Sequence, residues 1–213
     1  MKLDRKSMLL YAVTDRSWLN GRSLTSQIEQ TLEGGATFIQ LREKGLPFEE
    51  FLKEAIEVKK LTDKYNVPFV INDNADVAIQ CKADGVHVGQ SDMYSHDVRK
   101  KIGNDMILGV SAQTVEQAIE AEKNGADYIG VGAVFGTTTK LDADYVSYDT
   151  LYDICSKVSV PVVAIGGINE ENILELKGSG ICGVAVISAI FAQANIKEAT
   201  KRLIKLSKEA VGI

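Results

Sequence analysis

The chain has 213 residues, of which 45% are apolar and 25% are charged, and its formal net charge at pH 7 is -5. This composition is that of an ordinary globular protein with a sizeable core. The acidic balance argues against a nucleic-acid-binding protein, because such proteins carry a basic surface patch. Anionic substrates stay open, because a local group of cations or a metal ion can supply the positive field they need.

The three cysteines, Cys81, Cys155 and Cys182, have neither metal-binding nor CxxC spacing, which favours small buried thiols in a reducing compartment. The apolar run at residues 8–13 is interrupted at Thr14 and is too short for a secretory signal. No stretch reaches the roughly 18 apolar residues that span a bilayer. We therefore expect a cytoplasmic protein with no membrane partner.

Strand-like and helical segments alternate along the chain. Residues 9–15 predict the first strand, and a helical pattern follows over residues 23–35. Further strands are predicted at residues 38–44, 68–71, 85–89, 107–111, 128–135, 161–166 and 183–188. Further helical patterns begin near Pro47, Asn74, Ser95, Thr114, Tyr148, Asn169 and Asn195.

This alternation repeats eight times with a mean period of about 25 residues, and strands that alternate with helices predict a parallel sheet. No linker or change of composition divides the chain. We therefore predict an α/β protein in which residues 1–213 form a single-domain (β/α)8 TIM barrel. A doubly wound open sheet is the alternative, but it normally has fewer strands and less regular connections.

In such a barrel the site lies at the carboxyl ends of the strands. The second strand ends with Gln40, Arg42 and Lys44, which alternate at period two and therefore share one face. If that face is the barrel interior, two cations converge at the mouth, and an anion is expected there because unpaired buried charge is costly. The alternative is an internal ion pair with Glu43 or with an acid of a neighbouring strand.

Acids also follow the third and fourth strands, as Asp73 after Asn72 and as Asp92 after Gln90. Strands that are neighbours in a sheet lie about 4.8 Å apart, so acids at equivalent heights can share one cation. A few carboxylates with retained waters suit Mg²⁺ bound together with phosphate oxygens. The alternative is helix capping, although Asn74 and Ser95 are available for that task.

The remaining strand ends complete two predicted anion-binding regions, one with Arg42, Lys44, Lys140 and the expected metal ion, and one with backbone amides near Gly167 and Ser188. The fifth strand ends at Ser111, and a hydroxyl-rich loop with a final lysine follows the sixth, namely Thr137, Thr138, Thr139 and Lys140. Gly167 after the seventh strand and Ser188 after the eighth lie where these barrels bind phosphate. The residues therefore predict a transfer reaction between a diphosphate substrate and a phosphorylated acceptor.

At these strand ends the chain resembles the thiamine-phosphate synthase family. The resemblance rests on eight motifs that follow one another along most of the chain: QLREK (40–44), IND (71–73), HVGQSD (87–92), GVSAQT (109–114), GADYIGVG (125–132), TTTK (137–140), AIGGI (164–168) and VISAIF (186–191). It implies a barrel enzyme that joins an aminopyrimidine diphosphate to thiazole phosphate, or to its carboxylated form with loss of CO2. The implied reaction is dissociative, because diphosphate leaves before the thiazole nitrogen attacks.

The resemblance also implies roles for particular residues. Gln40, Arg42, Lys44, Asn72, Ser111 and Lys140 would hold the pyrimidine diphosphate, and Arg42, Lys44, Ser111 and Lys140 are the catalytic candidates. Asp73 and Asp92 would bind Mg²⁺, and Thr137, Thr139, Gly167, Ile187 and Ser188 would bind the thiazole phosphate. The substrate-binding set also takes in Leu41, Glu43 and Thr138, although Glu43 should point away from Arg42 and have a structural role.

Three other functions stay open. A thiazole tautomerase shares the barrel but needs no diphosphate metal site, and a phosphate barrel of tryptophan biosynthesis should show an acid and a base at the strand ends. A third possibility is a non-catalytic sensor of thiamine precursors. The expected partners are small-molecule substrates, a homo-oligomer is left open, and His87 is expected to be a hydrogen-bonded core histidine.

Overall fold

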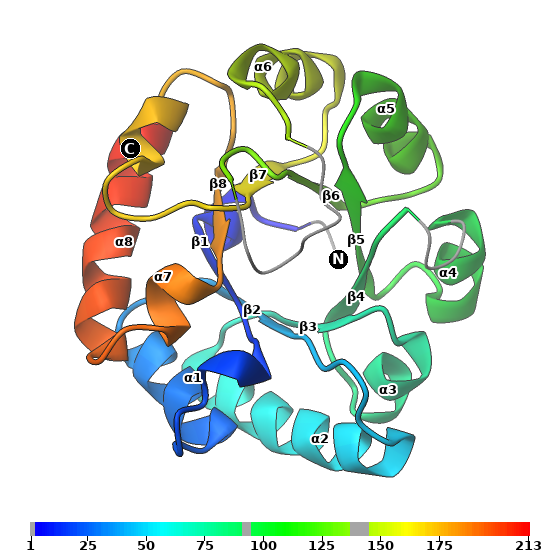
Figure 1. Cartoon of the computed structure of the whole chain (residues 1–213). Helices are drawn as coiled ribbons and strands as arrows, with labels where there is room; N and C mark the ends of the chain where they lie inside the picture. The colour runs from blue at the N-terminus through cyan, green and yellow to red at the C-terminus, as the bar shows by residue number, and fades with distance from the viewer. Residues whose placement is uncertain (1–2, 91–94, 137–144) are drawn as a thin grey trace.

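The structure is a computed structural model that describes residues 3–90, 95–136 and 145–213. Its centre is a closed barrel of eight strands, and each strand pairs in parallel with the next until β8 pairs with β1 (Figure 1). The strands are β1 (Leu10–Val13), β2 (Phe38–Leu41), β3 (Phe69–Asn72), β4 (Gly85–Val88), β5 (Ile107–Ala112), β6 (Tyr128–Val131), β7 (Val162–Ile165) and β8 (Gly183–Val186). The predicted (β/α)8 barrel is therefore confirmed.

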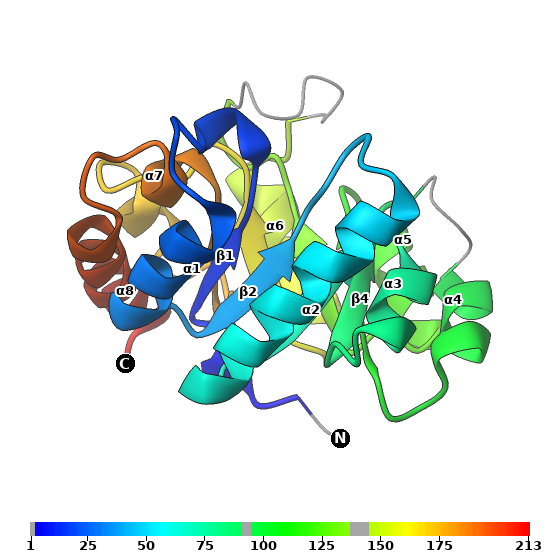
Figure 2. The ribbon, with the colours of Figure 1, turned by 90° about the horizontal axis from the view of Figure 1, so that it is seen from below.

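Helices surround the barrel on its outside (Figures 1 and 2). They are α1 (Leu24–Glu33), α2 (Phe48–Tyr65), α3 (Ala75–Gln80), α4 (Ser95–Ile102), α5 (Val115–Lys123), α6 (Tyr148–Lys157), α7 (Ser188–Phe191) and α8 (Ile196–Val211). Short 3-10 turns lie at η1 (Arg5–Met8), η2 (Arg16–Trp18) and η3 (Ile173–Leu176). In Figure 2 the N-terminal segment lies below the barrel, and the loops that follow the strands lie above it.

Polar side chains cap the start of five helices, namely α1, α3, α5, α6 and α8. The Asn74 side chain accepts a hydrogen bond from the Val77 amide and so caps α3, as predicted. Ser23, Thr114, Ser147 and Asn195 cap α1, α5, α6 and α8 in the same manner. These caps satisfy amides that would otherwise have no partner at the helix start.

One predicted helix is wrong in kind. The segment after β7 was expected to form a helix from Asn169, but it contains only the 3-10 turn η3. Gly178 and Gly180 follow it with positive φ angles of 86° and 89°, which turn the chain back toward β8. The chain therefore returns from η3 to β8 without forming an α-helix.

Six of the predicted strands are longer than the observed ones, among them the second and the sixth. The second ends at Leu41, because the next amide, that of Arg42, donates to the Thr14 hydroxyl at 3.0 Å instead of continuing the ladder. The sixth ends at Val131, although the amide of Phe135 still bonds to the Gly166 carbonyl at 3.0 Å. Both extra segments therefore belong to the loops at the mouth of the barrel.

Two apolar layers hold the fold together, as the alternation of strand side chains requires. The larger layer lies between barrel and helices and includes Leu41, Ile71 and Val131. The smaller fills the barrel interior, where Tyr11, Phe38 and Tyr128 meet edge to face with ring centroids 4.6 to 5.9 Å apart. This aromatic group forms the floor on which the site is built. Within the described residues, no helix is long and apolar enough to cross a membrane.

Candidate active site

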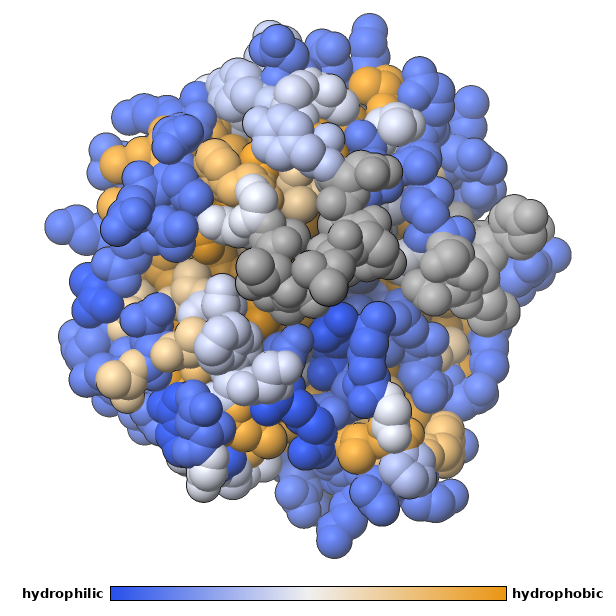
Figure 3. Space-filling view, viewed as in Figure 1, coloured by the Kyte–Doolittle hydropathy of each residue, from blue (hydrophilic) through white to orange (hydrophobic). Residues whose placement is uncertain are grey.

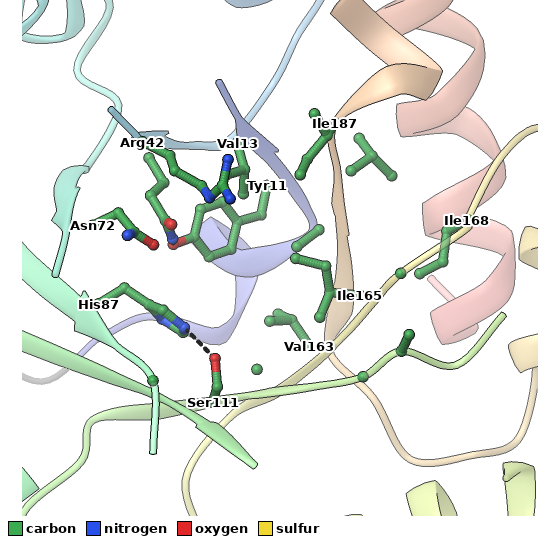
Figure 4. A pocket seen from close by; sticks show the side chains of 18 of the residues that line it. Tyr11, Val13, Arg42, Asn72, His87, Ser111, Val163, Ile165, Ile168 and Ile187 are labelled. Carbon is green, nitrogen blue, oxygen red and sulfur yellow. Dashed lines mark hydrogen bonds between the residues drawn. The ribbon is translucent and has the colours of Figure 1, made fainter. Parts of the chain in front are cut away.

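A cavity of about 330 Å³ opens at the carboxyl ends of the strands, and all eight strands or the loops after them contribute to its lining (Figure 4). Polar residues from β1 to β5 form one wall, and aliphatic residues and glycines from β6 to β8 form the other. Figure 3 shows this division from outside, with hydrophilic side chains gathered over the ends of β2 and β3. The cavity therefore offers a cationic, hydrogen-bonding half and an apolar half.

The cationic half comes from β2. Gln40 points into the barrel and is 4% exposed, and its side-chain amide nitrogen donates to the Tyr11 hydroxyl. Arg42 and Lys44 extend beyond the strand and line the cavity above Gln40. The structure therefore brings together the three residues whose period-two spacing predicted a common face.

Arg42 is held in place by an acid that follows the neighbouring strand β1, so an ion pair with a neighbouring acid, one of the alternatives, does form. Its Nη1 atom donates to the Asp15 carboxylate at 3.1 Å. The same side chain lines the cavity, so the ion pair and the anion site are not exclusive. A guanidinium that is anchored on one side can present its remaining donors in a fixed direction.

Two residues of the QLREK stretch do not line the cavity. Leu41 is fully buried in the layer between barrel and helices. Glu43 lies on the same outward side and pairs with Arg16 at 2.5 Å, not with Arg42. Burial raises the pKa of Glu43 to about 7, although Arg16 opposes the shift, and the nearby Glu54 carboxylate adds to it. The structural role expected for Glu43 agrees with this position.

Of the two predicted metal ligands, only Asp73 lies within the described residues. Asp73 lines the cavity beside Asn72, whose amide nitrogen donates to its carboxylate, and Asp92 lies outside the described residues. Among the residues that are described, no three His, Cys, Asp or Glu side chains form a metal-binding group. Asp73 nonetheless offers carboxylate oxygens at the rim of a cavity with cations nearby. This oxygen chemistry fits Mg²⁺ bound with phosphate oxygens and few protein ligands.

Ser111 lies on β5 at the bottom of the polar half. Its hydroxyl is 3.0 Å from Nε2 of His87 (Figure 4). The second ring nitrogen of His87 is 2.9 Å from the Tyr128 hydroxyl. His87 is 8% exposed, which agrees with the expected hydrogen-bonded core histidine, yet it also lines the cavity. The side-chain amide nitrogen of Gln90 donates to the backbone carbonyl of Ser111 at 2.6 Å, and this bond connects the loop after β4 to β5.

The opposite half contains the glycines after β7. Gly166 and Gly167 have φ angles of 101° and 68°, a conformation that side chains disfavour. A Cβ atom on Gly167 would lie 2.4 Å from the Gly136 carbonyl, so only glycine fits there. Ile187 and the exposed Ser188 complete this wall, and both line the same cavity as Arg42. The four predicted residues of the sixth loop, Thr137, Thr138, Thr139 and Lys140, lie outside the described residues.

The sequence prediction missed the aromatic floor. Tyr11 lines the cavity and Tyr128 lies directly below it, but neither was proposed as a site residue. Tyr11 lies within β1 and Tyr128 begins β6, and an aromatic side chain on a strand predicts only core packing. The alternation of side chains along a strand could have indicated that Tyr11 and Tyr128 point their hydroxyl groups into the barrel interior.

The fold and the site together define a (β/α)8-barrel enzyme. Cationic side chains line one side of its cavity, and a glycine-rich loop lines the opposite side. Residues 10–190 match the family model described as thiamine monophosphate synthase. The chain is 55% identical to thiamine-phosphate synthase of Ruminiclostridium cellulolyticum, over 92% of this chain and 94% of that one, and 50% identical to that of Clostridium tetani, over 91% and 93%. Its fold matches the thiamine phosphate pyrophosphorylase structure from Pyrococcus furiosus with a TM-score of 0.91 and 39% identity, over 98% and 99% of the two chains.

The chain belongs to the thiamine monophosphate synthase family. The activity of this family is that of a transferase, and the resemblance read from the eight motifs is confirmed.

Proposed function

We propose that the cavity joins 4-amino-2-methyl-5-(diphosphooxymethyl)pyrimidine to thiazole phosphate by a dissociative substitution that depends on Mg²⁺. One C–O bond breaks, and its electron pair leaves on diphosphate. The lone pair of the thiazole nitrogen then forms the new C–N bond to the pyrimidine methylene carbon. Where the thiazole carries a carboxylate, CO2 is lost afterwards. The observation that carries the proposal is the convergence of Arg42, Lys44 and Asp73 on one cavity that Gly167 borders from the other side.

On the diphosphate side, Arg42 and Lys44 bind the oxygens on which negative charge develops as the bond breaks. Arg42 is suited to this because Asp15 fixes one edge of its guanidinium group. Lys140 adds a third cation from the sixth loop. A Mg²⁺ ion held by Asp73 and Asp92 would neutralise further charge on the leaving diphosphate.

On the pyrimidine side, Gln40, Asn72 and Ser111 hold the ring so that its methylene carbon faces the acceptor. Each comes from a different strand and lines the cavity, which supports a common ligand for the three. Fixing both reactants in one geometry lowers the barrier, because little orientational freedom is then lost in the transition state.

On the acceptor side, the thiazole phosphate lies against Gly167, Ile187 and Ser188, with Thr137, Thr138 and Thr139 from the sixth loop. Gly167 permits the close approach of its backbone to a phosphate because it has no side chain. The neighbouring Ile165 and Ile168 give the thiazole ring an apolar surface. The mechanism needs no protein nucleophile, because both bonds change on the substrates themselves.

The test incubates the purified protein with Mg²⁺ and both substrates and measures thiamine phosphate and diphosphate. Formation of both products in equal amounts is expected, and absence of product with both substrates present overturns the proposal. Removing the divalent ion with EDTA should stop turnover, and adding Mg²⁺ back should restore it.

The same assay separates the rival functions. A tautomerase would convert the carboxylated thiazole phosphate without the pyrimidine diphosphate, and a sensor would bind the precursors without turnover.

We also assign the protein to the cytoplasm, which is supported by its three free thiols, and fractionation of the native cells tests this.

A further inference from the structure

An unbroken series of side-chain hydrogen bonds crosses the floor of the cavity from β2 to β5. Gln40 bonds to Tyr11, Tyr11 to Tyr128 at 2.8 Å, Tyr128 to His87 at 2.9 Å, and His87 to Ser111 at 3.0 Å. The two end residues, Gln40 and Ser111, are ones that the proposed function assigns to pyrimidine binding. Its middle is formed by residues that have no assigned role. Figure 4 shows Tyr11, His87 and Ser111 around the same part of the cavity.

The backbone is shaped to permit this series. In the strand register His87 lies opposite Gly109, and Gly109 lies opposite Tyr128. A Cβ atom on Gly109 would come within 2.3 Å of the Tyr128 hydroxyl and 2.5 Å of His87 Nδ1. His87 and Tyr128 therefore meet above a position that only glycine can occupy. This close fit sets the geometry of the central hydrogen bond.

The hydroxyl groups in the middle stay neutral. Tyr11 and Tyr128 are at most 1% exposed, and burial raises the pKa of both phenols above their ordinary value. Each phenol therefore brings a single proton to the series. Because each group can donate that proton only once, the direction of one bond constrains the direction of the next.

The direction follows from Gln40, whose amide nitrogen donates to the Tyr11 oxygen. Tyr11 then donates to Tyr128, Tyr128 donates to Nδ1 of His87, and Nε2–H of His87 donates to Ser111. In the opposite direction Tyr11 would accept from both Gln40 and Tyr128. Its own buried proton would then find no acceptor among the described contacts, which is unfavourable.

We propose that Tyr11, Tyr128 and His87 are positioning residues that fix which way Gln40 and Ser111 face the pyrimidine. Gln40 turns its carbonyl oxygen to the ligand as an acceptor, and Ser111 offers its hydroxyl proton as a donor. This pair is complementary to an amino group next to an unprotonated ring nitrogen. It mismatches the oxo analogue, in which a carbonyl oxygen lies beside a protonated ring nitrogen. The inference rests on the proposed function, because it concerns the pyrimidine half of that substrate pair.

The kinetic test uses Tyr128→Phe, which interrupts the series and keeps the aromatic packing. The KM for the aminopyrimidine diphosphate should rise about tenfold, which corresponds to one lost hydrogen-bond alignment. The KM for thiazole phosphate should stay unchanged. The preference for the amino over the oxo pyrimidine diphosphate, measured as a ratio of kcat/KM values, should fall by a similar factor. Tyr11→Phe should behave in the same way.

The matched control is Tyr148→Phe, which removes a phenol hydroxyl that bonds to the Lys177 carbonyl at 2.9 Å outside the cavity. It should leave both KM values and the amino-to-oxo preference unchanged. Circular dichroism and thermal unfolding establish that each variant is folded. A folded Tyr128→Phe enzyme with an unchanged preference overturns the proposal, and so does an equal change in both KM values, because that would indicate a general structural role.

A second readout does not depend on turnover. The chain has two histidines, so a His96→Gln variant leaves His87 as the only one. Its ¹⁵N NMR shifts report which ring nitrogen carries the proton, and the expected state is the neutral ring with the proton on Nε2. A proton on Nδ1 would overturn the proposed direction. If the protein makes no thiamine phosphate, the proposed function fails, whereas this spectrum still tests the direction of the hydrogen bonds.

Discussion

The backbone amide of Asp73 donates to the carbonyl oxygen of His87 at 2.8 Å, and this bond fastens the end of β3 to β4 at the rim of the cavity. Asp73 makes this bond with a φ angle of +61°, in the left-handed region. That conformation costs an ordinary side chain about 1–2 kcal/mol, and aspartate tolerates it better than most. The bond therefore fixes the direction in which the carboxylate leaves the strand.

The first prediction concerns this residue. Asp73→Gly should change the free energy of unfolding by less than about 1 kcal/mol, because relief of the left-handed conformation offsets the greater freedom of glycine when unfolded. Asp73→Ala should be less stable than Asp73→Gly by about 1 kcal/mol. Both should lose Mg²⁺-dependent turnover, because both lack the carboxylate. Urea unfolding and the coupled diphosphate assay measure the two effects. Full activity of either variant without added metal would contradict the assignment of Asp73.

The second prediction concerns Arg42. Arg42→Lys keeps the charge but cannot bind Asp15 and a phosphate oxygen through a planar fork. The kcat/KM for the pyrimidine diphosphate should fall about 10- to 100-fold, the range expected for a lost hydrogen bond to a charged group. The matched control is Arg99→Lys, which loses bonds to Asp127 and Gly125 outside the cavity and should reduce stability without reducing kcat/KM. Equal kinetics for the two variants would speak against a role of the Arg42 fork.

The third prediction concerns Gly109. Gly109→Ala places a methyl group 2.2 Å from the Tyr128 ring and should cost about 1–3 kcal/mol of stability, as overpacked cores do. Gly136→Ala is the control, because among the described residues no atom beyond the chain neighbours lies within 4 Å of the added methyl group. Thermal unfolding of the two variants gives the comparison. A Gly109→Ala protein as stable as Gly136→Ala would show that the barrel interior has more room than its packing indicates.

The fourth prediction is a dependence of stability on pH. The pKa of Glu43 is raised by burial from 4.5 to about 7, so the folded state binds a proton that the unfolded state releases between these values. The stability due to this group is therefore fully present below pH 4.5 and is lost as the pH rises through about 7. The unfolding free energy of the wild type minus that of Glu43→Gln should therefore fall as the pH rises from 4.5 to about 7. A difference that rises with pH would mean that Arg16 keeps the carboxylate ionised.

Much of the fold was predictable because its information is local. The alternation of strands and helices predicted the barrel, and the polar residues at strand ends predicted Gln40, Arg42, Asn72 and Ser111 as neighbours in one cavity. The α-helix after β7 was predicted wrongly, because the pattern from Asn169 did not distinguish an α-helix from the 3-10 turn η3 that forms there. Local pattern is thus a good guide to elements and a weaker one to their lengths.

The partners of individual side chains were harder to predict, because they depend on register between strands. Glu43 after β2 meets Arg16 after β1, and His87 meets Tyr128 over an intervening glycine. A shift of one residue in either pairing would remove these contacts without changing the alternation along the strands. The polar series on the cavity floor therefore becomes visible only in three dimensions.

The pairing of β8 with β1 has a further consequence for how the protein responds to its ligands. The proposed site residues lie on separate strands or just after them, from Gln40 on β2 to Ser188 after β8, so a ligand that contacted them all would connect opposite sides of the barrel. Ligand binding and resistance to opening of the barrel are then thermodynamically linked. Saturating substrate should slow hydrogen exchange at the amides of the β1–β8 seam, although the ligand contacts few of them. A ligand bound at the carboxyl ends of the strands would therefore also stabilise the closed barrel against opening.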